Sequence, residues 1–348
     1  MNTADVVVVG AGIIGGSIAW RLAQQGVRVT LLDAGAMGGE ASTAGAGMLA
    51  PGGEVSQHSR WAELAVDSLH LYPEFAAELS SETGIPIDYR ACGAVELAAG
   101  ETEWSKLTSR ARAQKAVGIP SHTMEAAELA ALNLGHYRAA LFYPEDAIVD
   151  PGDVMRALRA AIERWGVVLH EKTRVLRIEP AQAEVSLAGG QISAGLVVLA
   201  AGAWSSQLLE GVVESYPVKG HLLGYDLPPG SLQPIVRHQH TYILQRSNGF
   251  TIAGSTSERV GFDRQISAAT VATLHKRAHR CLPMLLPGAP KKVWIGFRPG
   301  AASEDPQVGR LEGTRAWLAY GHYRNGILLA PVTAREVVRG IMSSSGTD

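Results

Sequence analysis

The first part of the chain shows two hydrophobic patterns in succession. A continuous β-branched run over residues 6–9 is typical of a parallel strand that is buried on both faces. Apolar residues with helical spacing follow over residues 18–23, and a second apolar run covers residues 27–33. The pattern predicts a strand, a turn, a helix and a second strand, as in a βαβ unit.

The turn between the first strand and the helix contains the motif G-x-G-x-x-G. Gly10 permits a tight turn, Gly12 lets a pyrophosphate approach the backbone, and Gly15 lets helix and strand pack closely. The helix N-terminus stabilises the negative charge of the phosphates. Asp33, at the end of the second strand, can accept hydrogen bonds from ribose hydroxyls and would repel a 2′-phosphate. The unit therefore predicts a dinucleotide site for FAD or NAD, and not for an NADP-type ligand.

Further elements of a nucleotide domain follow much later in the chain. Residues 151–166 have helical spacing, residues 167–180 indicate a strand pair, and residues 196–205 indicate a buried strand that leads into a small-residue turn. Residues 38–51 (GGEASTAGAGMLAP) carry few large side chains, as expected of backbone that lies against a large flat ligand. Such a distance between the two halves is common in FAD proteins and uncommon in simple NAD dehydrogenases.

The intervening segments have a different character. Residues 54–142 include long helical stretches, and residues 216–300 alternate strands with turns, as in an antiparallel sheet. The predicted fold class is α/β, with a discontinuous Rossmann-type FAD-binding domain and an inserted antiparallel-sheet substrate domain. The predicted FAD-binding segments are residues 1–55, 143–215 and 295–348, and the predicted substrate-binding segments are residues 56–142 and 216–294.

Composition narrows the classes of function. The chain has 348 residues, of which 46% are apolar and 18% charged, as in an ordinary globular protein. A formal net charge of −2 gives no electrostatic footprint for nucleic acid. The apolar start is too short for a membrane span and lacks a basic n-region, so we expect no membrane partner and a cytoplasmic protein.

Cysteine and histidine usage argues against a disulfide framework and a metal site. Cys92 and Cys281 are the two cysteines, too few for a disulfide framework or a metal cage, and both are interpreted as structural. His238 and His240, spaced i and i+2, would share a strand face and resemble a metal pair. Because no third ligand is evident nearby, we expect strand-edge or pocket-wall histidines and no bound metal.

A series of motifs resembles the D-amino-acid oxidase superfamily of FAD enzymes, and within it the glycine oxidases of the thiamine pathway. In chain order the motifs are VVVVGAGIIGGSIAWRLA, MGGEASTAGAGML, AAGAWS, YPVKGHLL, TYILQR, WIGFRPG and GHYRNGILLAP. The resemblance covers nearly the whole chain and implies non-covalent FAD. Sarcosine oxidases of the same superfamily attach the flavin through a cysteine near the last motif, whereas no cysteine follows Cys281 here.

The resemblance also implies which residues contact FAD. Val175 would meet the adenine end through its backbone, Gly202 and Trp204 would line the flavin site, and residues 322–328 would wrap the isoalloxazine ring. Beside Gly10, Gly12, Gly15 and Asp33, the implied FAD contacts are Ile13, Ile14, Ala34, Ala41, Ser42, Ala46, Gly47, Met48, His322, Tyr323, Arg324, Asn325, Gly326, Ile327 and Leu328.

The substrate site is expected around Arg298. An arginine at the end of a buried strand is costly unless an anion pairs with it, and its planar fork suits a carboxylate. The resemblance implies that Arg298 binds the substrate carboxylate, that Tyr242 lines the pocket and that Arg324 lies near that carboxylate. Ser257 departs from the family, in which this position is more often apolar, so the resemblance does not define the limit on substrate size.

The implied activity is FAD-dependent oxidative deamination of glycine or small N-substituted glycines such as sarcosine, with oxygen as acceptor. The products would be an imine, hence glyoxylate and ammonia, together with hydrogen peroxide; the imine could supply thiazole formation in thiamine biosynthesis. No dedicated general base is expected. The alternatives are an FAD oxidase or dehydrogenase of a larger secondary amine or D-amino acid in secondary metabolism, a non-catalytic flavin-carrying subunit, and an NAD dehydrogenase. The family also suggests a homo-oligomer.

Overall fold

A computed structural model describes residues 4–283, 288–303 and 305–344. Its first sheet is built on the predicted βαβ unit, because α1 connects β1 to the parallel strand β2. β12 lies on the other side of β1, and β9 and β19 extend the parallel part outward in the order β9-β2-β1-β12-β19. The bounds of these elements are Ala4–Val9 (β1), Ile13–Gln24 (α1), Val29–Leu32 (β2), Val168–His170 (β9), Gly190–Leu199 (β12) and Ala316–Tyr320 (β19).

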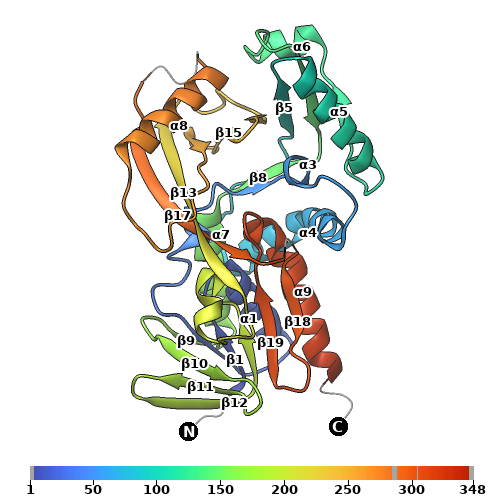
Figure 1. Cartoon of the computed structure of the whole chain (residues 1–348). Coiled ribbons are helices and arrows are strands. Elements are labelled where there is room, and N and C mark those ends of the chain that lie inside the picture. Colours follow the sequence, from blue (N-terminus) through green and yellow to red (C-terminus); the bar gives the residue numbers. More distant parts are fainter. Residues whose placement is uncertain (1–3, 284–287, 304, 345–348) are drawn as a thin grey trace.

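Antiparallel additions and helices complete this unit. β10 and β11 form a meander with the first half of β12, and β18 pairs with β19. α1 packs against α7 and α9, and Figure 1 shows α1 beside the C-terminal helix α9. The predicted strand pair over residues 167–180 is wrong as a pair, since β9 joins the parallel edge beside β2 whereas β10 joins β11. The bounds are Val175–Glu179 (β10), Glu184–Leu187 (β11), Gln307–Arg310 (β18), Pro151–Arg164 (α7) and Gly326–Ser344 (α9).

A second, mostly antiparallel sheet lies above the first unit in Figure 1, in the order β17-β13-β16-β15-β14-β5-β7-β6. Among the pairings of this sheet that the described residues form, only β14 with β5 is parallel. The strands β13 to β17 form the antiparallel sheet that the alternation over residues 216–300 predicts, whereas β5, β6 and β7 join it from residues 94–143, where only helical stretches were expected. The bounds are Lys292–Ala301 (β17), Ser215–Asp226 (β13), Phe250–Gly254 (β16), Thr241–Gln245 (β15), Ile235–His238 (β14), Ala94–Ala98 (β5), Ala139–Tyr143 (β7) and His122–Thr123 (β6).

The two faces of this sheet belong to different cores, because successive side chains of a strand point to opposite faces. Leu222 and Leu244 join the core that contains α1 and β1. Their neighbours on the same strands, Leu223 of β13 and Ile243 of β15, belong to a second core. This core also contains Leu274 of α8 (Ala268–Cys281). One face of the sheet is thus directed toward the nucleotide unit, and the other is covered by α8.

The remaining elements connect these layers. α4 packs against α7 and α9, and a small sheet of β3, β8 and β4 lies between the two large sheets in Figure 1. The division into discontinuous FAD-binding and substrate-binding domains stays a prediction. Among the described residues, no helix has the length and apolarity needed to cross a membrane. The bounds are Ala41–Ala44 (α2), Met48–Leu49 (β3), Pro51–Glu54 (α3), Arg60–Thr83 (α4), Tyr89–Arg90 (β4), Glu101–Lys115 (α5), Ala126–Ala131 (α6), Ala147–Val149 (β8) and Gly202–Gln207 (a 3-10 helix).

Candidate active site

The glycine-rich turn after β1 has the geometry that the motif predicts. Gly10 has φ = +105°, in the region that side chains disfavour. A Cβ at position 15 would lie less than 3.0 Å from the carbonyl oxygen of Gly10, so only glycine permits this close approach of helix and strand. α1 begins three residues after Gly10, and its N-terminal cap is Gly12, which has no side chain to accept a helix N–H.

Side chains from two later segments hold this turn. Oδ2 of Asp33 accepts a hydrogen bond from the backbone N–H of Ala11 at 2.7 Å, and Oγ of Ser42 accepts one from the N–H of Ile13 at 2.9 Å. Asp33 therefore fixes the glycine turn as well as being available to a ribose through its remaining lone pairs. Ser42 brings the small-residue segment to the N-terminus of α1.

The small-residue segment 38–51 is tied down along its length. The indole N–H of Trp294 donates to the carbonyl of Ala44 at 3.0 Å, and the guanidinium of the buried Arg246 donates to the carbonyl of Ala46. Backbone that is held by Trp294 of β17 and by Arg246, the residue after β15, forms a fixed wall. The interpretation of this segment as a surface to lie against a flat ligand is consistent with that geometry.

The C-terminal turn before α9 lines the same cavity as the small-residue segment. Gly321 and Tyr323 both have positive φ, +79° and +47°, and the N–H of Tyr323 donates to the carbonyl of Pro299 at 3.0 Å. His322 is 4% exposed, and its Nε2 lies 3.0 Å from Oγ1 of Thr333. Burial lowers the pKa of His322 from 6.5 to about 4, so its imidazole is neutral at neutral pH.

These walls enclose a cavity that extends from the N-terminus of α1 to the inner face of the second sheet. Most of the predicted cofactor and substrate residues line it, although they come from segments spread over more than 300 positions of the chain. The predicted residues that line the cavity are Gly12, Ile13, Ile14, Ala41, Ser42, Ala46, Gly47, Met48, Gly202, Tyr242, Arg298, His322, Tyr323, Arg324, Asn325, Gly326 and Ile327.

Other predicted residues lie outside the cavity lining. Trp204 stacks on Phe262 with ring centroids 4.6 Å apart, and Leu328 is fully buried in the core. Val175 is buried at the start of β10, where it pairs with Leu187. The other predicted residues outside the lining are Gly10, Gly15, Asp33, Ala34 and Ser257.

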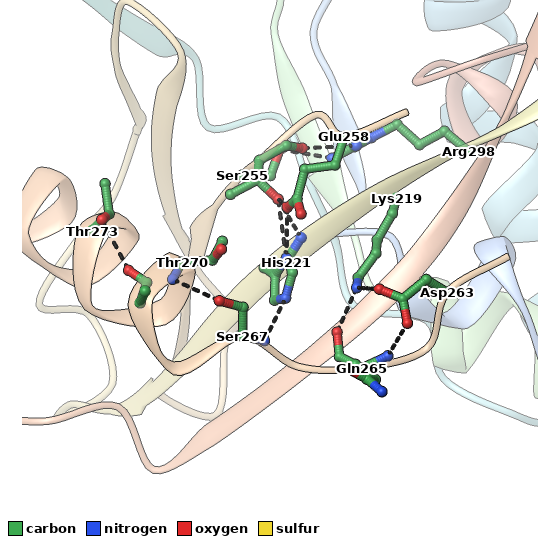
Figure 2. A network of polar contacts seen from close by, with 12 residues as sticks. Lys219, His221, Ser255, Glu258, Asp263, Gln265, Ser267, Thr270, Thr273 and Arg298 are labelled. Carbon is green, nitrogen blue, oxygen red and sulfur yellow. Dashed lines mark hydrogen bonds and ion pairs between the residues drawn. The ribbon is translucent and has the colours of Figure 1, made fainter. Parts of the chain in front are cut away.

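Arg298 occupies the inner face of the second sheet and is held by neutral oxygens. Its Nη2 donates to Oγ of Ser255 at 2.7 Å and its Nη1 to the carbonyl of Thr256 at 2.9 Å (Figure 2). Gly220 lies directly beneath, since a Cβ there would come within 3.0 Å of the guanidinium. Burial lowers the pKa of Arg298, and it forms no ion pair with a carboxylate of the described residues. A positive charge in this state suits an anionic ligand.

The second predicted cation of the site has a different environment. Nη2 of Arg324 lies 3.0 Å from Oε1 of Glu54, and this negative charge raises the pKa of Arg324. Glu54 also lines the cavity, and sequence reasoning missed it. Its position at the end of the small-residue segment is the signal that could have found it, because a carboxylate next to a predicted ligand-binding wall needs a partner.

Tyr242 lies between these cations and an unpredicted ionic network. It is 6% exposed, and burial raises its pKa. Its hydroxyl lies over Gly254, since a Cβ at position 254 would lie less than 3.0 Å from the Tyr242 hydroxyl oxygen. Its cross-strand neighbour is Arg237, whose Nε lies 2.9 Å from Oε2 of Glu96 and whose Nη1 lies 2.7 Å from Oδ2 of Asp146. Strand alternation places Arg237 and Tyr242 on the same face, which is the sequence signal that points to Arg237.

Ser257 lies at the outer side of the site. It is exposed, and its Oγ is 3.2 Å from the hydroxyl of Tyr323. Ser257 lines a surface hollow that shares Glu54, His322, Tyr323 and Asn325 with the main cavity. The contact between Ser257 and Tyr323 therefore lies where the outer hollow adjoins the cavity.

The histidines and cysteines do not form a metal or disulfide site. His238 ends β14 and lies 3.2 Å from Glu103, whereas His240 lies in the following turn. The expectation that the two histidines share a strand face is therefore wrong. No group of metal-binding side chains occurs in the part of the chain that the structure describes. Cys92 and Cys281 are free thiols, and neither lines the cavity.

The lining fits FAD in its chemistry. At one end the uncapped N-terminus of α1 presents backbone N–H groups to phosphates, and Asp33 lies beside it. The small residues 41–48 leave room for a flat ring system, and α9 begins at Gly326 against the same space, where its N-terminus stabilises negative charge. Arg298 and Tyr242 lie on the sheet face beyond.

Comparison with known proteins identifies the class. A model of the FAD dependent oxidoreductase family matches residues 5–339, and the chain belongs to this family. Among curated relatives it is similar to the glycine oxidase of Geobacillus kaustophilus, with 35% identity over 343 residues, covering 94% of this chain and 90% of that protein. It is also similar to the bifunctional protein ThiO/ThiG of Trichormus variabilis, with 35% identity over 345 residues, covering 95% of this chain and 52% of that protein.

Solved structures agree with this assignment. The crystal structure of glycine oxidase from Geobacillus kaustophilus superposes with a TM-score of 0.92 at 33% identity, over 98% of this chain and 95% of that chain. The glycine oxidase of Bacillus cereus superposes with a TM-score of 0.91 at 27% identity, over 98% of this chain and 95% of that chain. The predicted fold class and the FAD cofactor are thereby confirmed.

Proposed function

We propose that this protein oxidises glycine and small N-substituted glycines such as sarcosine with bound FAD, and that oxygen accepts the electrons. The observation that carries the proposal is the state of Arg298, a partly buried guanidinium with no carboxylate partner among the described residues, which lines the same cavity as the N-terminus of α1. The similarity to glycine oxidases over nearly the whole chain supports the same substrate.

The residues of the site would orient the substrate rather than react with it. Arg298 would hold the carboxylate through charge-assisted hydrogen bonds, and the Tyr242 hydroxyl would close the space beside it. The charge of Arg324 is balanced by Glu54, so Arg298 contributes the unbalanced charge of this cluster. A single unbalanced cation favours the amino-acid anion with a neutral amine over the zwitterion, and the neutral amine is the form that can donate its lone pair during oxidation.

When bound, FAD would supply the acceptor for a hydride from the substrate Cα, and oxygen would reoxidise the flavin and be reduced to hydrogen peroxide. The residues of the chain exclude water and hold the carboxylate, and no side chain is needed to abstract a proton from carbon. The imine leaves the site and hydrolyses to glyoxylate and the amine of the substrate, which is ammonia from glycine and methylamine from sarcosine. We further propose a link to thiamine biosynthesis, supported by the similarity to a bifunctional ThiO/ThiG protein. We also propose that the protein is cytoplasmic and forms a homo-oligomer, whose size size-exclusion chromatography would measure.

A substrate panel measured by peroxide release tests the proposal. Glycine and sarcosine should be oxidised, and Arg298→Met should raise KM for glycine by about two orders of magnitude while FAD remains bound. A preference for a bulky secondary amine or D-amino acid would favour the alternative, for which the outer hollow beside Ser257 would provide room. Dye reduction without oxygen consumption would identify a dehydrogenase instead of an oxidase.

A further inference from the structure

The peptide segment that holds Arg298 is itself held by the opposite face of the sheet. This segment, residues 255–267, connects β16 to α8, and we call it the arm. The Arg298 guanidinium donates two hydrogen bonds to the start of the arm, one to Oγ of Ser255 and one to the carbonyl of Thr256. The position of the guanidinium therefore depends on where the arm lies.

Lys219 of β13 makes the first set of contacts with the arm. Its backbone N–H and carbonyl each form a 2.9 Å hydrogen bond with the backbone of Glu258. Its ammonium lies 2.8 Å from Oδ2 of Asp263 and also donates to the carbonyl of Gln265. Lys219 is 2% exposed, and a buried ammonium is costly unless it is paired, so its charge favours the conformation in which the arm supplies Asp263.

His221, two residues further along β13, joins both ends of the arm. Its Nδ1 lies 2.9 Å from Oε1 of Glu258, and its backbone N–H donates to Oγ1 of Thr256 at 2.9 Å. The Thr256 hydroxyl donates in turn to the same Glu258 oxygen at 2.6 Å. Nε2 of His221 accepts the N–H of Ser267, the N-cap of α8, at 3.4 Å. An accepting Nε2 and a donating Nδ1 define one neutral tautomer of the ring.

The alternation of side chains along β13 explains how these contacts reach Arg298. Lys219 and His221 flank Gly220 and point to the face opposite to it. Arg298 lies over Gly220 on the inner face, while the arm crosses beside β13 and receives hydrogen bonds from both faces. Figure 2 shows this arrangement, with Arg298 at one end of the network and Lys219 and His221 on β13.

We propose that Lys219 and His221 are positioning residues, which set the Arg298 guanidinium through the arm and so determine the affinity of the site for the substrate carboxylate. The inference rests on the proposed function, because it takes Arg298 as the group that binds this carboxylate. The hydrogen bonds that lead from Lys219 and His221 to Arg298 involve no residue of the nucleotide-binding turn in the described part of the chain. The arm also contacts the small-residue segment, through Arg264 and Glu40, and the C-terminal turn, through Ser257 and Tyr323, so the FAD content of each variant is measured beside its carboxylate affinity.

Two mild variants on the exposed side of the network test the proposal. Glu258→Gln removes the charged acceptor shared by His221 and Thr256, and Asp263→Asn removes the charge that pairs with Lys219. The probe is acetate, a non-oxidisable carboxylate, titrated into the holoenzyme by its change in flavin absorbance. The Kd of acetate and the KM for glycine should both rise about tenfold, with kcat and bound FAD unchanged, because a displaced guanidinium loses charge-assisted hydrogen bonds.

Controls separate positioning from general destabilisation. Asp226→Asn removes an exposed ion pair with Lys291, 2.7 Å long, at the other end of the same strand, and should leave the Kd of acetate unchanged. Asp263→Glu, which keeps the charge, should restore most of the affinity that Asp263→Asn loses. In an Arg298→Met background, Glu258→Gln should have no further effect on acetate binding, because the network acts through Arg298.

Each part of the proposal can fail by itself. Unchanged acetate binding in both Glu258→Gln and Asp263→Asn, with binding weakened by about two orders of magnitude in Arg298→Met, would refute the positioning role and leave the proposed function intact. An additive effect of Glu258→Gln in the Arg298→Met background would also refute it. Unchanged acetate binding in Arg298→Met would instead refute the carboxylate site on which the inference rests.

Discussion

Arg324 and Glu54 form an ion pair on the wall of the cavity, with Nη2 and Oε1 3.0 Å apart. Arg298, which also lines the cavity, is held by a hydroxyl and a carbonyl and has no carboxylate partner among the described residues. The two arginines therefore differ in kind, although both were expected near a substrate carboxylate. One charge is balanced within the protein, and the other is available to an anion.

Removing either member of the ion pair should change carboxylate affinity in opposite directions. Glu54→Gln leaves Arg324 unbalanced, so the Kd of acetate should fall about threefold to tenfold, whereas Arg324→Gln leaves a negative charge near Arg298 and should raise it by a similar factor. Flavin absorbance titrations give both values. The double variant should return close to the original affinity; a large loss in Arg324→Gln that Glu54→Gln does not offset would instead show direct substrate binding by Arg324.

Gly220→Ala should displace Arg298 without disturbing the fold. The new Cβ would lie less than 3.0 Å from the guanidinium, which is the far end of a flexible side chain and can move away. The KM for glycine should rise at least about tenfold, while the thermal midpoint changes little. The measurement is steady-state peroxide release beside a thermal melt of the holoenzyme.

Gly189→Ala is the matched control, because a Cβ at this exposed turn position meets nothing within 4 Å. It should leave the KM for glycine unchanged. An unaltered KM in Gly220→Ala as well would mean that Arg298 does not need its observed position to bind substrate.

Stability should fall in mild acid because of His322. Its folded-state pKa of about 4 lies below the ordinary 6.5, since burial disfavours the charged imidazole. Between pH 6.5 and 4 the unfolded state binds a proton that the folded state does not, so the free energy of unfolding decreases as pH falls, by about 3 kcal/mol at most. Urea unfolding at a series of pH values measures this slope.

The contribution of His322 is isolated by His322→Gln, which cannot take up a proton in this range. The variant should lose part of the pH dependence between 6.5 and 4 even if it is less stable throughout. Identical slopes in the two proteins would assign the acid sensitivity to other groups.

The flavin should be released by acid. No cysteine follows Cys281, and neither cysteine lines the cavity, so a cysteinyl link to the flavin has no attachment point. Trichloroacetic acid precipitation of the holoenzyme should leave the yellow colour in the supernatant. Fluorescent flavin in the washed pellet or on a denaturing gel would contradict non-covalent binding.

The local pattern of the sequence predicted the nucleotide-binding unit because that unit is made from adjacent segments. A β-branched run, the glycines at positions 10, 12 and 15 and a helical pattern act within a short stretch, where steric limits on backbone angles dominate. The antiparallel sheet was likewise predicted from alternation within strands. The pairing of the two strands within residues 167–180 was predicted wrongly, since β9 pairs with β2 and β10 pairs with β11. The neighbour that a strand joins depends on the rest of the sheet.

The sequence by itself determined the βαβ unit, the alternating strands and the chemical character of Arg298. Only the tertiary structure decided that Glu54 balances Arg324, that Arg237 pairs with Glu96 and Asp146, and that the arm ties Arg298 to β13. The physical reason is that an ion pair or a hydrogen bond depends on distance in space, and these partners are separated by tens to hundreds of positions along the chain. Periodicity reports the face on which a side chain lies, whereas its partner is determined by how the sheets and helices pack.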